Sequence, residues 1–393
     1  MRNIEKANPD TLYDIFGDAS WTNKNRLSDE TLTNLIEHYS QHKLSLGNIA
    51  DDKLGNAYEY LIKEFADDSG HTAAEFYTNR TVVKLMTMIM DPQPGESVYD
   101  PTCGSGGLLL NCALHLKEEG KEYRTLKLYG QEINLITSAI ARMNMFMHGI
   151  EEFSIVRGDT LANPAFLHND ELKKFNVILA NPPYSIKAWD QKSFANDPYV
   201  RNLWGVPPQG CADYAFQQHI QKSLDDDNGR SISLWPHGVL FRDSEGEMRR
   251  KMIEEDLVEC VIGLGPNLFY NSPMEACLLI TKTNKTPVTK GKVLFINAVN
   301  EVRQNKTIGF LDEKHINKIF DAYKKFEDQE YFSALVTIED VLENKGNMNI
   351  SLYVEPEKEG NKALPFGQAF TDWDKSGDEL KSSMKELFQI LEN

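Results

Sequence analysis

The sequence predicts an α/β protein built on a doubly wound, mostly parallel sheet of seven strands, with an antiparallel last strand and small helical N-terminal and C-terminal pieces. Apolar runs suited to strands alternate with helical patterns between residues 97 and 282, which is typical of a parallel sheet. The last two runs, 257–264 and 275–282, are joined by too few residues for a crossover helix. We therefore expect these two strands to be antiparallel neighbours.

The chain of 393 residues is long enough for one large domain with flanking pieces. We expect a helical N-terminal region over 1–70, the sheet domain over 71–285, a strand and helix extension over 286–355, and a linker with a C-terminal helix over 356–393. In the first region, LSDETLTNLIEHYSQ and GNAYEYLIKEFAD carry apolar residues at helical spacing.

The composition, 41% hydrophobic and 26% charged, is that of a globular protein. No apolar run has the length of a transmembrane helix, and the first residues contain no apolar signal segment. The cysteines form no CxxC pair and no metal-ligand spacing, which indicates reduced thiols in the cytoplasm and argues against a zinc site or a disulfide framework. They are Cys103, Cys112, Cys211, Cys260 and Cys277.

The net charge of −17 limits any interaction with nucleic acid. DNA affinity depends mainly on Lys and Arg side chains that neutralise phosphates. We expect so acidic a chain to bind DNA poorly by itself unless its basic residues cluster on one face. If DNA is the substrate, a second subunit should supply much of the affinity and the sequence reading.

The first strand of the sheet, Ser97 to Asp100, leads into a glycine loop, Gly104 to Gly107, and then into an apolar helix from Leu108. A strand, a glycine loop and a helix in this order are typical of nucleotide-binding folds. The loop lacks the GxGxxG spacing of dinucleotide sites, and Asp100 can meet a ligand amine. This favours a cofactor that carries an amino acid, although a glycine-rich turn without a ligand stays an alternative.

The second and third strands also end in carboxylates. Glu132 ends the strand that begins at Leu126, in the place where such folds hold ribose hydroxyls. Asp159 follows the strand from Phe153 to Val156 and can accept a hydrogen bond from an adenine amine, or serve as a turn or cap residue. The Met-rich run MNMFM in the intervening helix is interpreted as core filler.

The run NVILANPPY contains a buried strand, Val177 to Ala180, that two prolines end abruptly. The Asn181 side-chain oxygen and the Pro182 carbonyl can accept the two hydrogens of an exocyclic adenine amine, which would aim the nitrogen lone pair at an electrophile. Tyr184 can stack on the base. The alternative is an ordinary Asn-Pro turn followed by a core tyrosine.

After this strand we expect a long polar loop, Ser185 to Gly210, and then a helix, 211–224, that carries Asp213 near its start. The sequence then predicts three further strands and a solvated helix over SEGEMRRKMIEED. It also predicts a strand over KVLFINAVN and a helix over EKHINKIFDAYKKF. The long loop has no evident internal use and is interpreted as a surface. The last helix is predicted to dock on its own domain or on a partner with one apolar stripe. The stripe consists of Leu380, Met384, Leu387 and Ile390.

The chain resembles the amino-group adenine DNA methyltransferases through a set of motifs in a fixed order. They are DPTCGSGG, Glu132, RGDTL, NPPY, CADYAFQQHI and NLFYNSP. AEFYTNR, and PHGVLFR combined with NLFYNSPMEACLL, look most like the modification subunit of type I restriction–modification systems. The resemblance covers residues 8–355. Members usually carry a longer helical domain before the segment that matches NPDTLYDIF, so this chain departs from the family there.

The resemblance implies a methyltransferase sheet, S-adenosylmethionine as the methyl donor, the N6 amine of adenine in DNA as the acceptor, and no metal. The residues that would bind the cofactor are Phe76, Tyr77, Thr78, Asp100, Thr102, Gly104, Ser105, Gly106, Glu132, Asp159 and Asn181. Those that would hold and activate the base are Asn181, Pro182, Pro183 and Tyr184. Asp100, Gly104 and Gly106 would bind the methionine part of the cofactor, and Glu132 would bind its ribose.

The same resemblance implies an assembly of two copies of this chain with one specificity subunit, which a restriction subunit joins, and no membrane. Two other interpretations of the sequence stay open. One is a non-catalytic subunit that keeps the fold for structural reasons. The other is a methyltransferase that acts on RNA or on protein glutamine, because NPPY also occurs in such enzymes.

Overall fold

The computed structural model of the chain describes residues 2–9, 12, 15–16, 23–25, 27–43, 51–68, 78–268, 274–305, 308–355, 370–371, 373–378, 381 and 383–384. Contacts divide the chain into two units, Met1–Glu355 and Pro356–Asn393. The finer domain boundaries after residues 70 and 285 stay predictions.

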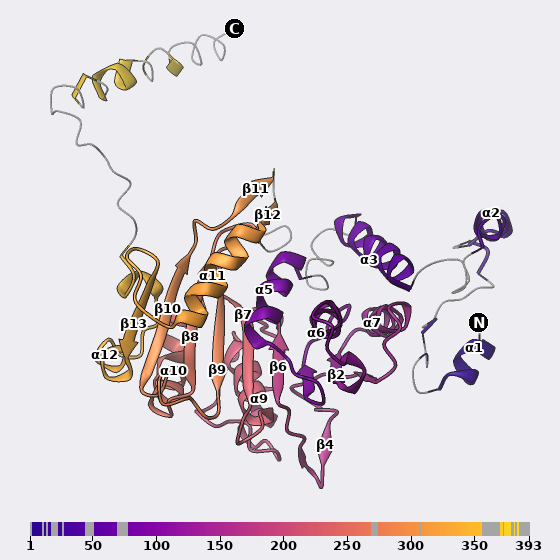
Figure 1. Ribbon diagram of the computed structural model, residues 1–393, viewed down its shortest axis with the longest axis horizontal. Coiled ribbons are helices and arrows are strands. Elements are labelled where there is room, and N and C mark those ends of the chain that lie inside the picture. Colours follow the sequence, from indigo (N-terminus) through magenta and orange to yellow (C-terminus); the bar gives the residue numbers. More distant parts are fainter. Residues whose placement is uncertain are drawn as a thin grey trace. The chain divides into compact units, whose positions relative to one another are not determined.

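A nine-stranded sheet forms the centre of the first unit, in the order β13-β10-β8-β9-β7-β6-β1-β2-β3 (Figure 1). The strands are β1 (Ser97–Asp100), β2 (Lys127–Glu132), β3 (Phe153–Arg157), β6 (Val177–Ala180), β7 (Arg230–Pro236), β8 (Val258–Leu264), β9 (Ala276–Lys282), β10 (Lys292–Ala298) and β13 (Ser333–Thr337). The run from β3 to β8 is the predicted seven-stranded sheet. β9 is antiparallel to both β7 and β8, which confirms the predicted antiparallel pair. β10, predicted as a strand, and β13 extend the sheet beyond β8.

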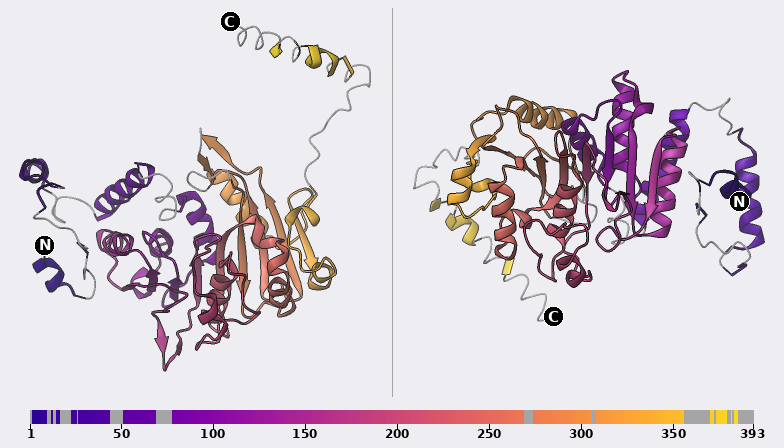
Figure 2. Two further views of the ribbon diagram at one scale, coloured as in Figure 1. Left: turned by 180° about the vertical axis from the view of Figure 1, so that it is seen from behind. Right: turned by 90° about the horizontal axis from the view of Figure 1, so that it is seen from below.

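Helices cover both faces of this sheet (Figures 1 and 2). Those that contribute to the core on one face are α5 (Arg80–Met90), α6 (Gly107–Glu118), α7 (Leu135–Met147) and α11 (Glu313–Lys325). Those on the other face are α9 (Asp213–Ser223), α10 (Gly246–Glu254) and α12 (Ile338–Glu343). This two-sided cover explains why strand β6 is buried along its whole length.

The remaining elements complete the described part of the chain. They are α1 (Arg2–Ala7), α2 (Asp29–Ser40), α3 (Asp51–Asp68), α8 (Gln191–Ala195), β4 (Leu167–His168), β5 (Glu171–Leu172), β11 (Arg303–Asn305), β12 (Ile308–Phe310) and short 3₁₀ turns at Tyr123–Thr125, His237–Leu240, Asp243–Glu245 and Ile350–Leu352. Among the described residues, none of these helices has both the length and the apolar character needed to cross a bilayer.

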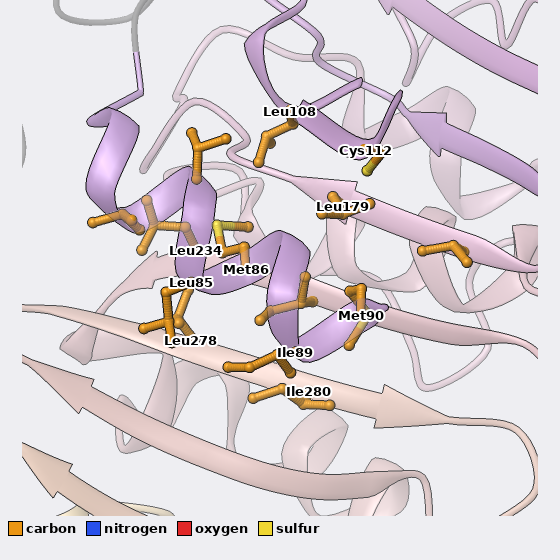
Figure 3. Close-up of a cluster of buried hydrophobic side chains, with 14 of the residues drawn as sticks. Leu85, Met86, Ile89, Met90, Leu108, Cys112, Leu179, Leu234, Leu278 and Ile280 are labelled. Carbon is orange, nitrogen blue, oxygen red and sulfur yellow. The ribbon is translucent and has the colours of Figure 1, made fainter. Parts of the chain in front are cut away.

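Helix α5 anchors the core next to β6 (Figure 3). It begins after Asn79, whose Oδ1 atom accepts the backbone N–H of Thr81 at 3.0 Å. Its apolar stripe then packs on the side chains of β6, β7 and β9. The buried side chains labelled there include Leu85, Met86, Ile89 and Met90 of α5 and Leu179, Leu234, Leu278 and Ile280 of the strands. Each contributes about 1.5–3 kcal/mol on burial, so the start of α5 is firmly placed beside the end of β6.

The predicted long loop from Ser185 to Gly210 is mostly loop around the short helix α8, but some of its side chains are buried, so the expectation of a free surface was wrong in part. Arg201 and Trp204 are 2% and 1% exposed. The guanidinium of Arg201 forms a buried ion pair with Asp197 at 2.6 Å and donates to the backbone oxygen of Thr160 at 2.8 Å. Arg201 and Asp197 neutralise each other within the segment, so these two charged side chains are buried. The polar composition of the segment therefore did not show which of its residues are exposed.

Two helical predictions have different outcomes. Helix α10, expected to be solvated, buries Met248, Arg249, Met252 and Ile253 on one side, so the expectation was wrong for that side. Of the predicted C-terminal stripe, Met384 is described and 48% exposed. Leu380, Leu387 and Ile390 lie outside the described residues.

Candidate active site

A glycine-rich turn connects β1 to α6 at the carboxyl end of the sheet. Gly104 and Gly106 have φ angles of +53° and +80°, in the left-handed region that favours glycine. A Cβ atom on Gly106 would also lie 2.9 Å from the Cε atom of Met145. At the start of the turn, Oδ1 of Asp100 accepts the backbone N–H of Thr102 at 2.9 Å. The turn is therefore tight, and its backbone can closely approach a ligand.

Glu132 ends β2 and links this turn to the next one. Its Oε2 atom accepts the N–H of Gly104 at 3.0 Å, and its Oε1 atom accepts the N–H of Asn134 at 2.8 Å. The residue is 7% exposed. These two bonds hold the carboxylate at the end of β2, between the two turns.

Asp159 follows β3 and caps the turn behind it. Its Oδ1 atom accepts the N–H groups of Leu161 and Ala162 at 2.9 and 3.1 Å, which is the turn role that the sequence left open. Because β6, β1, β2 and β3 are neighbouring parallel strands, their carboxyl ends meet at one edge of the sheet. That edge carries Asn181, Asp100, Glu132 and Asp159 in turn.

Asn181 is held from two sides directly after β6. Its Nδ2 atom donates to Oγ1 of Thr78 at 3.0 Å, and its Oδ1 atom accepts the hydroxyl hydrogen of Tyr184. The Tyr184 ring lies 6.4 Å from that of Trp235, between ring centroids. Burial raises the pKa of Tyr184 well above its ordinary value, so its hydroxyl is a neutral donor. Phe76 and Tyr77, predicted to flank the cofactor, lie outside the described residues.

Two hollows adjoin these groups and share Thr102 and Asn181. The first encloses about 510 Å³ between atoms, its mouth included, and the second about 740 Å³. Polar residues that line the first are Thr78, Asp100, Gly104, Ser105 and Asn111. The second is lined by residues that include Glu132, Ile133, Asp159, Pro183, Trp189 and Phe216. The structure therefore brings most of the described predicted residues together around the two hollows, although Gly106, Pro182 and Tyr184 line neither of them.

The charge of Asp100 depends on what the first hollow contains. Burial and the nearby Glu132 carboxylate raise the pKa of Asp100 to about 8, although the hydrogen bond from Thr102 opposes the rise. The side chain is 1% exposed. In this environment the carboxyl group is mostly protonated at neutral pH. A cationic ligand group beside it would favour the carboxylate form.

Sequence reasoning missed several residues of this site. Asn144 of α7 is 1% exposed and lines the first hollow; its Nδ2 atom donates to the backbone oxygen of Ser105 at 3.1 Å. Its Oδ1 atom is buried and has no hydrogen-bond partner among the described residues. Buried polar atoms normally have partners. Asn144 lies within MNMFM, where an amide among methionines was the available signal.

A buried ion-pair group supports the segment that follows Tyr184. Ser185 has φ +51°, and its N–H donates to Oδ1 of Asp213 at 2.6 Å. Arg242 donates to Oδ2 of Asp213 at 2.5 Å and to Oε2 of Glu245 at 2.8 Å. The motifs CADYAF and PHGVLFR thus meet behind NPPY, and they position its loop rather than line the hollows at these residues.

Two groups of possible metal ligands occur in the part of the chain that the structure describes. Cys211, Asp213 and Glu245 form the first, where the guanidinium of Arg242 already supplies positive charge to both carboxylates. The second is Asp91, His115 and Glu119, where Lys121 pairs with Glu119 at 2.7 Å. In both groups the carboxylates already have cationic partners.

Comparisons with known proteins agree on one family. The model of the N-6 DNA methylase family matches residues 49–362. The chain is 32% identical over 362 residues to the type I restriction enzyme MjaVII methylase subunit of Methanocaldococcus jannaschii, covering 88% of this chain and 60% of that protein. It is also 32% identical to the MjaVIII methylase subunit of the same organism, covering 98% of this chain and 69% of the relative.

A solved structure shares the fold closely. The type I restriction–modification methyltransferase subunit from Streptococcus thermophilus superimposes with a TM-score of 0.80 at 34% identity. The match covers 90% of this chain and 75% of that one. This chain thus spans about three fifths to three quarters of the length of these relatives.

Proposed function

Because this chain belongs to the N-6 DNA methylase family, we propose that it transfers the methyl group of S-adenosylmethionine to the N6 amine of an adenine in DNA. It would do so as the modification subunit of a type I restriction–modification complex, in the cytoplasm. The observation that carries the proposal is the position of Asn181, which borders both hollows directly after the buried strand β6. An amide there can hold an amine beside a cofactor that spans the two spaces.

The residues present fit this cofactor. S-adenosylmethionine supplies, when bound, a methyl group on a positively charged sulfur. The first hollow suits its methionine part, because Asp100 offers a carboxyl group there and Gly104 of the tight turn leaves its wall without a bulky side chain. The second suits its adenosine, with Glu132 for the ribose hydroxyls and Asp159 for the base amine. The unpaired Oδ1 of Asn144 can accept a donor of the ligand.

The acceptor amine would be activated by groups around Asn181. Its Oδ1 atom and the Pro182 carbonyl would take the two amine hydrogens, so the nitrogen lone pair is directed towards the methyl group. Pro182 and Pro183 keep the carbonyl in place, because proline fixes its φ angle. The Tyr184 hydroxyl donates a hydrogen bond to Oδ1 of Asn181. The amine of an entering base would replace this hydrogen bond, and the released Tyr184 ring could then stack on the base.

Cofactor affinity is expected to depend on pH through Asp100. Its pKa of about 8 means that a proton should leave when a cationic ligand group binds beside it. Affinity should therefore rise with pH up to about 8 and then level off. Calorimetry at pH 7 in two buffers of different protonation enthalpy should show proton release for the wild type. Asp100→Asn should bind more weakly and release fewer protons; equal release would contradict this assignment.

The substrate class can be tested by offering alternatives in parallel. Tritium transfer from labelled S-adenosylmethionine would be measured on duplex DNA, RNA and a release-factor protein with a target glutamine. We expect transfer to DNA alone, which makes the RNA or glutamine alternative the contradicting outcome. A chain that binds the cofactor but methylates none of the three, even with partner subunits, would instead be a non-catalytic subunit.

The proposed partners are a specificity subunit, a second copy of the chain, DNA and a restriction subunit. The net charge of −17 argues against tight binding of DNA by the chain alone. We therefore expect the isolated chain to bind the cofactor but to methylate duplex DNA weakly or not at all. Addition of the specificity subunit should restore transfer in the same tritium assay. Full activity of the isolated chain would rule out this dependence.

A further inference from the structure

The guanidinium of Arg201 contacts residues that line the second hollow, and no step described above uses it. Its Nε and Nη2 atoms donate to the two carboxylate oxygens of Asp197 at 2.9 and 2.6 Å. Its Nη1 and Nη2 atoms donate to the backbone oxygens of Thr160 and Leu161 at 2.8 and 2.7 Å. Nη1 also lies 3.4 Å from Nδ1 of His219, so each N–H donor of the guanidinium has a partner. Any effect of Arg201 on a ligand must therefore come through the residues that it holds.

Two walls of the second hollow meet at Thr160. Thr160 and Leu161 belong to the loop after β3, and both line the hollow together with Asp159. The hydroxyl of Thr160 donates at 2.5 Å to the backbone oxygen of Pro101, which lines the hollow from the loop after β1. Since Arg201 holds the carbonyls of Thr160 and Leu161, it fixes the loop after β3 in its contact with the loop after β1.

The third wall comes from the segment after Tyr184. Trp189 of this segment lines the hollow, and its ring packs edge-on against Phe194 of α8, with 5.7 Å between the ring centroids. The Cζ atom of Arg201 lies 5.5 Å from the centroid of the same Phe194 ring. Asp197 follows α8, so its ion pair with Arg201 attaches this segment to the loop after β3.

A single peptide group connects Arg201 to the carboxylate of Asp159. The peptide between Thr160 and Leu161 gives its carbonyl oxygen to Nη1 of Arg201, and its N–H donates to Oδ1 of Asp159 at 2.9 Å. A peptide group is planar, so its two ends turn together. The contact with Arg201 therefore sets the direction of the N–H that orients the Asp159 carboxylate.

We infer that Arg201 is a positioning residue for adenine recognition in the second hollow, because it holds the peptide group that orients Asp159 towards the exocyclic amine of a bound adenosine. This rests on the proposed function, in which Asp159 meets that amine. Recognition of this kind needs a side chain held within about 0.5 Å of its productive position. The alternative is that Arg201 only stabilises the fold and has no influence on which base is bound.

Two ligands that differ at this amine test the inference. They are 5′-methylthioadenosine and 5′-methylthioinosine, in which a carbonyl oxygen replaces the amine and would face the carboxylate. By calorimetry, the full-length wild type should bind the adenosine ligand at least about tenfold more tightly. In Arg201→Lys the ammonium can pair with Asp197, but it cannot also reach both carbonyls as the guanidinium fork does. The preference of this variant should fall to about threefold or less.

Arg230→Lys is the matched control. Arg230 pairs with Glu96 and donates to the backbone oxygens of Met90 and Asp91 at 2.7 and 3.0 Å, so it also joins one carboxylate and two carbonyls. It begins β7, at the end of the sheet opposite to the second hollow. This variant should lower the melting temperature as Arg201→Lys does, but it should keep the wild-type preference.

Thr160→Val is a milder change in the same loop. It removes the hydroxyl that binds Pro101 and leaves the contacts of Arg201 in place. The preference for the adenosine ligand should fall by about threefold, and this variant decides the question if Arg201→Lys does not fold.

Three results would overturn the inference: a wild-type preference in Arg201→Lys, an equal loss in Arg230→Lys, or a wild type that does not distinguish the two ligands. In the complete complex, Arg201→Lys should raise the KM for S-adenosylmethionine, while kcat at saturating cofactor stays within about threefold. A fall in kcat with an unchanged KM would contradict the inference as well.

Binding and transfer together separate this inference from the proposed function. A wild type that prefers the adenosine ligand but methylates no DNA in the complete complex would refute the function and leave the role of Arg201 in place. An active complex whose ligand preference is unchanged in Arg201→Lys would refute the role of Arg201 alone.

Discussion

Asn181→Ala is expected to lower methyl transfer to DNA by at least about a hundredfold, while the Kd for S-adenosylmethionine stays within a few fold. The substitution removes the side-chain oxygen that would accept an amine hydrogen, and it leaves Asp100, Glu132 and the glycine turn in place. It also removes the acceptor of the Tyr184 hydroxyl and the donor to Thr78. Transfer is measured with tritiated cofactor in the complete complex, and binding by calorimetry.

The matched control for this variant is Asn176→Ala. Asn176 precedes β6 just as Asn181 follows it, and its Oδ1 atom accepts the N–H of Ser97 at 3.0 Å at the opposite end of the strand. Its loss should cost stability, about 1 kcal/mol, and leave the transfer rate near that of the wild type. Retained transfer in Asn181→Ala, or an equal loss in the control, would remove Asn181 from the mechanism.

Arg242→Ala should lower the free energy of unfolding by about 3–5 kcal/mol. Asp213 and Glu245 are 1% and 0% exposed, and Arg242 donates to both. Burial already raises the pKa of Glu245, and the charge of Arg242 opposes that rise. Without the guanidinium, two carboxyl groups would be left buried beside each other. Urea unfolding monitored by fluorescence would measure this change in the free energy of unfolding.

Arg250→Ala provides the comparison for this effect. Arg250 belongs to α10 and pairs with Glu254 at 2.7 Å, but both side chains are at least 40% exposed. Exposed pairs contribute about 0–1 kcal/mol, so this variant should unfold nearly as the wild type does. If both variants lost the same free energy of unfolding, burial would not determine how strongly the Arg242 ion pairs stabilise the fold. We also expect reduced methylation in Arg242→Ala, because Asp213 holds Ser185 after Tyr184.

Most of the sheet was predictable because its signals are local. The run Val177 to Ala180 is apolar without interruption and ends at two prolines, which indicates a fully buried strand and its last residue. The glycine turn and the carboxylates that end β1 and β2 have the same local character. Once these strands are parallel neighbours, their carboxyl ends must meet, so Asp100, Glu132 and Asn181 converge.

Other features depend on contacts that no local pattern specifies. The polar segment after Tyr184 packs inward because Arg201 and Asp197 pair with each other. Strand β13 joins the sheet through pairing with β10. In both cases the sequence shows polar or apolar residues, but it does not show which distant group each of them contacts.

The sequence by itself determined the seven-stranded α/β fold, the motifs of an adenine methyltransferase and the edge of the sheet where they gather, because strand periodicity and turn residues act over a few positions. Only the tertiary structure decided that Glu59 of α3 lies beside Arg80 in the wall of the first hollow, and that Asn144 of α7 lines the same hollow. Helical spacing says that one side of a helix is buried. It does not identify the residues against which that side packs, because these residues lie elsewhere in the chain and are selected by packing over the whole domain.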